Sequence, residues 1–231
     1  MTVTLITGAN KGLGFETARR LVEAGHTVYV GARDARGGQE AAARLGARSV
    51  TIDVTDEKSV EAAAAFVRED AGRLDVLVNN AGIIGARKPV GEVTGDDMRD
   101  TYETNVFGAV RVTRAFLPLL EAGDASVVVN VGSGLGSIAA TTDPERVEFH
   151  VAALDYNSSK TALVMVTSQY AKAYPRIRFN VVDPGYTATD LNAHQGVKTV
   201  EEGAEVIVRL ASIGADGPTG GFFDEDGPAA W

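Results

Sequence analysis

The stretch that decides the fold is VTLITGANKGLG, residues 3–14, in which a short apolar segment runs directly into a glycine-rich loop. Val3–Thr7 predicts a buried strand, and the apolar residues after the loop recur at helical spacing. The three glycines of the loop permit a sharp turn and a close approach of the backbone to a ligand. A strand, a glycine loop and a helix in this order are typical of a pyrophosphate site at a helix N-terminus. An ordinary glycine-rich turn is the alternative for the loop alone.

The rest of the chain continues this alternation of strands and helices. The predicted strands are Val3–Thr7, Thr27–Gly31, Ser49–Ile52, Val76–Asn79, Ser126–Val131 and Arg178–Val182. The predicted helices are Leu13–Ala24, Gln39–Leu45, Glu57–Asp70, Asp97–Leu120, Tyr156–Ala173 and Val200–Ala211. Because most of these strands are apolar throughout, the pattern predicts an α/β fold with a doubly wound parallel sheet and helices on both faces. No linker or repeat interrupts the alternation, so residues 1–231 are expected to form one domain.

The composition narrows the function classes. The chain has 45% apolar residues, enough for a core, and a net charge of −9. Nucleic-acid binding needs a basic surface, so the acidic balance argues against it. The chain has no Cys, and its three His lack metal-ligand spacing, so no metal is expected. Neither a membrane span nor a secretion leader is predicted, and a cytoplasmic location is expected.

The end of the second predicted strand indicates which nucleotide the loop prefers. An NAD-binding fold has an acidic residue there for the ribose 2′-hydroxyl, whereas this chain has Ala32 and Arg33. A 2′-phosphate suits a guanidinium with a second cation, and Lys11 in the glycine loop is the candidate for that cation. The charges therefore favour NADP(H) over NAD(H). For each basic residue alone, a solvated surface charge is the alternative.

Tyr156 and Lys160 are the candidate catalytic pair. They open a predicted helix and lie one turn apart on the same face. A phenol is a poor acid or base at neutral pH, and a neighbouring ammonium is expected to lower its pKa toward the working range. A Tyr-x-x-x-Lys spacing alone is only suggestive, because it also arises by chance.

Several motifs occur together in one order along the whole chain. They are Thr7–Gly14, Asn79-Asn80-Ala81-Gly82, Asn105 in Asn-Val-Phe-Gly, Ser133, Tyr156 with Lys160, and Pro184-Gly185. This series resembles the short-chain dehydrogenase/reductase family, and in detail its carbonyl-reductase-like, NADPH-preferring members. The resemblance implies a Rossmann fold with a seven-stranded parallel sheet. It also implies a reversible, NADPH-dependent reductase that converts small-molecule ketones or aldehydes to alcohols.

The resemblance implies a catalytic role for four residues. Tyr156 would exchange the proton with the carbonyl oxygen, and Ser133 would polarise that carbonyl. Lys160 would lower the pKa of Tyr156 and bind the nicotinamide ribose. Asn105 would anchor a relay water. A linker-like role is the alternative for Ser133.

The resemblance places a larger set of residues at the cofactor. They are Gly8, Asn10, Lys11, Gly12, Leu13, Gly14, Arg33, Asp53, Val54, Asn79, Ala81, Gly82, Tyr156, Lys160, Pro184, Gly185, Thr187 and Thr189. Asp53 and Val54 would lie at the adenine, and Thr189 at the carboxamide. A strand-end turn is the alternative for Asn79–Gly82 and for Asp53, and a helix cap is the alternative for Thr189.

Two segments depart from the alternation and are expected at the substrate. Residues 134–155 form an insertion before the tyrosine helix, and residues 185–198 form a short loop. Asp143-Pro144-Glu145 predicts the start of a short helix in the insertion. In the carbonyl reductases that the chain resembles, a longer insertion here blocks helix-to-helix assembly, so a monomer or homodimer is expected rather than a tetramer. The candidate pocket walls are Leu135, Phe149, Tyr186, Leu191 and His194, with Ile83 and Ile84 near the nicotinamide and core packing as the alternative for each.

Two other functions stay open. A 3-oxoacyl-thioester reductase of lipid or polyketide synthesis predicts a tetramer and a basic patch for an acyl-carrier protein, and the acidic chain and the insertion count against it. A redox-sensing protein that binds NADP without chemistry tends to lose the Tyr, Lys or Ser, and all three are present here.

Overall fold

Seven strands form one sheet in the order β3-β2-β1-β4-β5-β6-β7 in the computed structural model, which describes all 231 residues. Every pair of neighbouring strands runs parallel. The strands are β1 Val3–Thr7, β2 Thr27–Ala32, β3 Arg48–Thr51, β4 Val76–Asn79, β5 Val127–Val131, β6 Arg178–Val182 and β7 Phe222–Phe223. The predicted fold class is confirmed. The last strand has only two residues, and the family resemblance alone had implied it.

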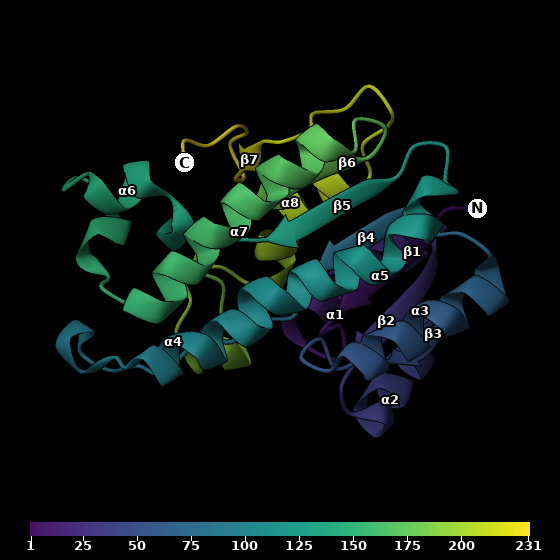
Figure 1. The fold of residues 1–231 in the computed structure, drawn as a ribbon, viewed down its shortest axis with the longest axis horizontal. Helices are drawn as coiled ribbons and strands as arrows, with labels where there is room; N and C mark the ends of the chain where they lie inside the picture. The colour runs from purple at the N-terminus through teal and green to yellow at the C-terminus, as the bar shows by residue number, and fades with distance from the viewer.

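Helices cover both faces of the sheet (Figure 1). They are α1 Gly12–Glu23, α2 Ala35–Leu45, α3 Glu57–Ala71, α4 Gly95–Tyr102, α5 Ala109–Glu121, α6 Ile138–Thr142, α7 Leu154–Ala173 and α8 Val200–Ala211. Successive strand residues point to opposite faces, so Leu5 packs with α3 and α5 while Ile6 packs with α1 and α8. This two-sided burial is why the strands are apolar throughout.

The predicted helix over Asp97–Leu120 and the predicted helix start at Asp143-Pro144 need correction. The single helix predicted over Asp97–Leu120 is interrupted, because a π-helical turn, Glu103–Gly108, separates α4 from α5. A helix does not start at Asp143-Pro144; α6 instead ends just before this pair, and a 3₁₀ turn follows at Val147–His150. The residue before a proline is disfavoured in helical conformation, and Asp143 is extended, so the pair terminates a helix here.

The strand order also locates the ligand crevice. The connections run outward in opposite directions from β1 and β4, which are neighbours at the centre of the sheet. Ligands of open parallel sheets bind beyond the carboxyl ends of the strands at such a reversal. The loops that follow β1 and β4 therefore border the expected site. No helix combines the length and the apolar character that crossing a membrane requires.

Candidate active site

Side-chain hydrogen bonds join the loops that follow β1 and β4. The Thr7 hydroxyl accepts from the backbone N–H groups of Asn80 and Ala81, both at 3.1 Å. The Asn80 amide donates to the carbonyl oxygens of Thr7 and Gly8, at 2.8 and 3.1 Å. These bonds hold Gly8 and Ala81 side by side at the carboxyl edge of the sheet. Sequence reasoning missed Asn80, although it stands within the Asn-Asn-Ala-Gly motif.

The glycine loop has the geometry of an anion-binding turn. Gly8 and Gly12 have φ of 64° and 56°, the left-handed region that favours glycine. A Cβ on Gly14 would lie 2.6 Å from the carbonyl oxygen of Gly8 and 2.9 Å from Cα of Ala9, so the loop packs tightly against its own helix. α1 begins within the loop and has no acidic residue in its first turn. Its free N–H groups and dipole therefore present a positive end to a ligand.

The two predicted phosphate cations differ in the structure. Arg33 follows β2, is exposed and makes no hydrogen bond or ion pair. Its charge helps to lower the pKa of Asp53, against the opposing effect of burial and together with hydrogen bonds from Thr55. Lys11 is instead paired with Asp190 at 2.8 Å. Of the two cations expected in the basic pocket, only Arg33 is unpaired. Lys11 would have to break its ion pair with the exposed Asp190 carboxylate before it could bind a phosphate.

The predicted catalytic residues come from three elements. Ser133 follows β5, Asn105 lies in the π-helical turn, and Tyr156 and Lys160 lie in the first turns of α7. The Lys160 ammonium is buried, 5.6 Å from the centre of the Tyr156 ring, and donates to the carbonyl of Val131 at 2.8 Å. The end of β5 therefore carries Ser133 and also fixes Lys160.

The pKa of Tyr156 and the pKa of Lys160 are both shifted by burial. Burial raises the pKa of Tyr156 to about 12, even though the Ser133 hydroxyl lowers it. Burial lowers the pKa of Lys160 to about 8, with the charge of Asp183 opposing. The pKa of Tyr156 thus shifts in the direction opposite to the expected lowering by the lysine. The reason is that the ammonium bonds to the Val131 carbonyl and burial dominates both groups.

Asn105 lies beside Lys160 without bonding to it. Its amide oxygen accepts from the N–H of Ile83 at 2.9 Å, and its amide nitrogen donates to the carbonyl of Ile83 at 2.9 Å and to the Ser159 hydroxyl at 3.0 Å. A Cβ on Gly82 would lie 3.3 Å from the Asn105 oxygen and 3.6 Å from Nζ of Lys160. Gly82 thus leaves open the space where these two groups meet. A π-helical turn at this residue fits the frequent occurrence of such turns at functional sites.

Asn79 lies inside the protein rather than at the glycine loop. Its amide nitrogen donates to Asn130 at 2.8 Å and to Thr113 at 3.1 Å, and its oxygen is buried without a partner. The side chain therefore links β4 to β5 and α5. Strand alternation turns this side chain into the core, while the side chain of Asn80 reaches the glycine loop.

The loop after β6 reaches back to the glycine loop. The methyl group of Thr189 lies 3.6 Å from where a Cβ on Gly12 would be. Thr189 also precedes a 3₁₀ turn, and its N–H donates to Asn192 at 3.2 Å. Thr187 is buried, and its hydroxyl donates to the carbonyl of Pro184 at 3.0 Å. The Thr187 hydroxyl thus stabilises the loop through a bond inside the loop itself. Thr189 instead contacts the start of α1.

Asp183 is a carboxyl group in this region that sequence reasoning missed. It accepts from the N–H of Gly185 at 2.9 Å, and a Cβ on Gly134 would lie 2.8 Å from its other carboxylate oxygen. It therefore links the loop after β6 to the loop that carries Ser133. Burial raises its pKa, and the carboxylates of Glu148 and Asp224 raise it further. The Asp-Pro-Gly sequence gave only a turn signal, so nothing in it marked a buried carboxyl.

The predicted pocket walls are largely solvent-exposed. Ile83, Phe149, Tyr186 and Leu191 are 38–52% exposed, so core packing is wrong for these four. Leu135 and Ile84 are half-buried, and His194 is exposed and pairs with Asp190. Val147 and Val151 add further exposed apolar surface to the insertion. The two segments around the catalytic residues therefore carry an apolar surface.

Comparisons with known proteins agree with this geometry. Residues 2–199 match the family model described as short chain dehydrogenase. The chain is 31% identical to a (+)-neomenthol dehydrogenase of Capsicum annuum, over 95% of this chain and 94% of that protein. An NADPH-bound carbonyl reductase from chicken fatty liver covers 100% of both chains at 28% identity, with a TM-score of 0.88. A 3-ketoacyl-(acyl-carrier-protein) reductase of Brucella melitensis, complexed with NADH, covers 97% of this chain and 96% of its own at 27% identity, with a TM-score of 0.85.

Proposed function

Because the chain belongs to the short-chain dehydrogenase family of oxidoreductases, we propose that it reduces apolar ketones or aldehydes to alcohols with NADPH. The observation that carries the proposal is the convergence of three groups at the carboxyl edge of the sheet. The Ser133 hydroxyl acts on Tyr156, and the Lys160 ammonium lies 5.6 Å from the Tyr156 ring and beside Gly82. Two hydroxyl groups and one buried ammonium at this position suit a carbonyl oxygen that gains negative charge.

The residues present fit a dinucleotide. The left-handed glycines, the open space at Gly82 and the α1 N-terminus favour it, and the free guanidinium of Arg33 favours a 2′-phosphate. We assign the adenine end to Asp53 and Val54, and the nicotinamide end to Lys160, Pro184, Gly185 and Thr189. Bound NADPH would supply the hydride. Both an NADPH-bound and an NADH-bound structure are similar to this one, so the choice of NADPH rests on Arg33.

The chain's own residues would handle the proton and the charge. Tyr156 carries its proton at neutral pH, because its pKa is about 12, and can give that proton to the carbonyl oxygen. The Ser133 hydroxyl would hold and polarise the same oxygen. Lys160 would stabilise the phenolate that remains. The exposed apolar side chains of the insertion and of the loop after β6 favour an apolar substrate.

The test of this function is turnover of a panel of activated and bulky apolar ketones with NADPH. Loss of reduced-nicotinamide absorbance that depends on both ketone and enzyme is expected. A panel that includes a 3-oxoacyl thioester separates the second candidate, which the similar ketoacyl reductase favours. Binding of NADPH without turnover of any carbonyl would contradict the proposal and favour a redox-sensing protein.

Asp183→Asn is expected to shift the pH dependence of the reverse reaction, alcohol oxidation. The negative charge of Asp183 raises the pKa of Tyr156, so its removal lowers that pKa. Oxidation needs the phenolate, and its rate rises with pH through the Tyr156 pKa. The rising limb of the kcat profile should therefore move to lower pH. Glu148 and Asp224, the other acidic neighbours, remain in the variant.

Asp216→Asn is the matched control, because Asp216 is exposed in the loop before β7 and makes no hydrogen bond or ion pair. Its profile should coincide with that of the wild type. If the rising limb of the kcat profile of Asp183→Asn stays at the wild-type pH or moves to higher pH, the charge of Asp183 does not raise the pKa of Tyr156.

A further inference from the structure

The loop Asp53–Thr55 has little regular structure to hold it. It lies between β3 and α3, beyond the end of a strand. One Asp53 carboxylate oxygen accepts from the N–H and the hydroxyl of Thr55, at 3.0 and 2.7 Å, and the Ser59 hydroxyl accepts from the N–H of Asp53 at 2.9 Å. The bonds with Thr55 lie within the loop, and the bond to Ser59 joins the loop to α3. None of them fixes it to the body of the protein on the side of α5.

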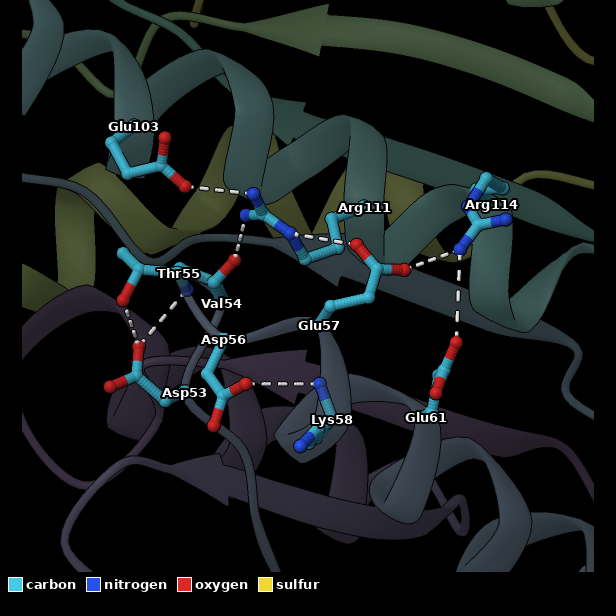
Figure 2. Close-up of polar contacts among 10 residues, drawn as sticks. All are labelled: Asp53, Val54, Thr55, Asp56, Glu57, Lys58, Glu61, Glu103, Arg111 and Arg114. Atoms are coloured by element: carbon cyan, nitrogen blue, oxygen red, sulfur yellow. Dashed lines mark hydrogen bonds and ion pairs between the residues drawn. The ribbon is translucent and has the colours of Figure 1, made fainter.

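Arg111 makes that connection (Figure 2). It donates to the carbonyl of Val54 at 2.5 Å, to Glu57 at 3.1 Å and to Glu103 at 2.7 Å. No other group donates to the Val54 carbonyl. The Arg111 side chain is only 17% exposed, so water competes little for these bonds. One side chain of α5 therefore joins the loop, the start of α3 and the π-helical turn.

Packing supports the same connection. Val54 is buried, and a Cβ on Gly108 would lie 2.9 Å from one of its methyl carbons. Gly108 ends the π-helical turn, one helical turn before Arg111. Val54 is thus held by its side chain against Gly108 and by its carbonyl against Arg111. The N–H of Val54 donates no hydrogen bond within the protein, and the second carboxylate oxygen of Asp53 accepts none.

We infer that Arg111 is a positioning residue for the adenine end of the cofactor site. It holds Val54 in place, so that the free polar groups of Asp53 and Val54 meet an adenine ring without a rearrangement of the loop. This inference rests on the proposed function, since it needs a nucleotide at this loop. Loss of Arg111 would leave the Val54 carbonyl without a donor and Val54 held only by its packing against Gly108, and binding would then require ordering of the loosened loop.

The neighbouring Arg114 provides a matched control. It binds the other oxygen of Glu57 and lies 3.9 Å from Glu61, but it contacts neither Val54 nor Glu103 (Figure 2). Arg111→Met and Arg114→Met therefore each remove one positive charge from α5 and one ion-pair partner from Glu57. Only the first variant releases the loop.

The experiment measures binding of adenosine 2′,5′-bisphosphate, which lacks nicotinamide, and of NADPH, by calorimetry. Loss of one buried charged hydrogen bond is expected to raise both Kd values about tenfold in Arg111→Met, and Arg114→Met should stay within about twofold of the wild type. Arg111→Lys keeps the charge without the planar fork, and should give an intermediate Kd. With NADPH saturating, kcat of Arg111→Met should stay within about twofold, because the reacting groups are untouched.

Three results would overturn the inference. If Arg111→Met and Arg114→Met bind equally well, Arg111 does not position the loop. If Arg111→Met lowers only the fraction of competent protein and leaves Kd unchanged, its role is general stability. If the wild type binds neither ligand, the proposed function fails together with the inference.

Discussion

Replacing Tyr156 by phenylalanine is expected to lower kcat for ketone reduction about 1,000-fold, since a positioned acid contributes roughly 10²–10⁴ to the rate. The variant keeps the ring that packs at the start of α7 and loses only the hydroxyl. Without it, the carbonyl oxygen has no proton donor, and the Ser133 hydroxyl alone faces the charge. Steady-state kinetics give the loss of kcat. Calorimetry should give an unchanged Kd for NADPH, because no phosphate-binding group is removed.

Tyr170→Phe is the control for this variant. Tyr170 lies in the same helix, stacks on Tyr174 and Phe179, and its hydroxyl makes no hydrogen bond. Its kcat is expected to equal that of the wild type. Retention of more than a tenth of the activity in Tyr156→Phe would show that another group protonates the product.

Replacing Arg33 by aspartate is expected to lower the preference for NADPH over NADH, measured as a ratio of kcat/KM values, by about 100-fold. Arg33 is the one uncommitted cation at the end of β2, so its fork is free for a 2′-phosphate. Hydrogen bonds to charged groups are worth about 1.5–3 kcal/mol, and every 1.4 kcal/mol is tenfold. The new carboxylate would also repel the phosphate and accept from a ribose 2′-hydroxyl, which favours NADH.

Arg36→Asp makes the same charge change three residues further on. Arg36 is exposed in α2 and pairs only with Glu40, at 2.9 Å. The ratio should be unchanged in this variant. If Arg33→Asp leaves the ratio unchanged as well, the charge argument for NADP(H) is wrong. If both variants lower it equally, the preference comes from the overall field of this surface rather than from a contact.

The sheet could be predicted because its strands depend on local pattern. The predicted ranges Val76–Asn79 and Arg178–Val182 coincide with β4 and β6, since runs buried on both faces leave a strong signal. The start of α2 was missed by four residues, because the two glycines after Ala35 weaken the helical pattern and the signal at Asp34 is a cap. The π-helical turn at Asn105 was also missed, because a single extra residue in a turn leaves no periodic trace.

The site could be predicted less completely, because it depends on contacts between distant segments. The motifs named Ser133, Tyr156 and Lys160, but not the Val131 carbonyl that takes the lysine or the burial that raises the pKa of the tyrosine. Asn79 and Asn80 have the same side chain, and only strand alternation decides that the second reaches the glycine loop. Asp183 is a further case, because its neighbour Gly134 belongs to a loop that is distant in the sequence.

The most direct test of the central claim, hydride transfer to a carbonyl at Tyr156, follows a label. The wild-type enzyme is incubated with a ketone that it turns over and with NADPH carrying deuterium at C4 of the nicotinamide, on each face in turn. Mass spectrometry of the alcohol is expected to find one deuterium on the carbinol carbon, from one of the two labelled forms, and no such product with Tyr156→Phe. An alcohol without the label from either form, or equal labelled product with Tyr156→Phe, would contradict the account.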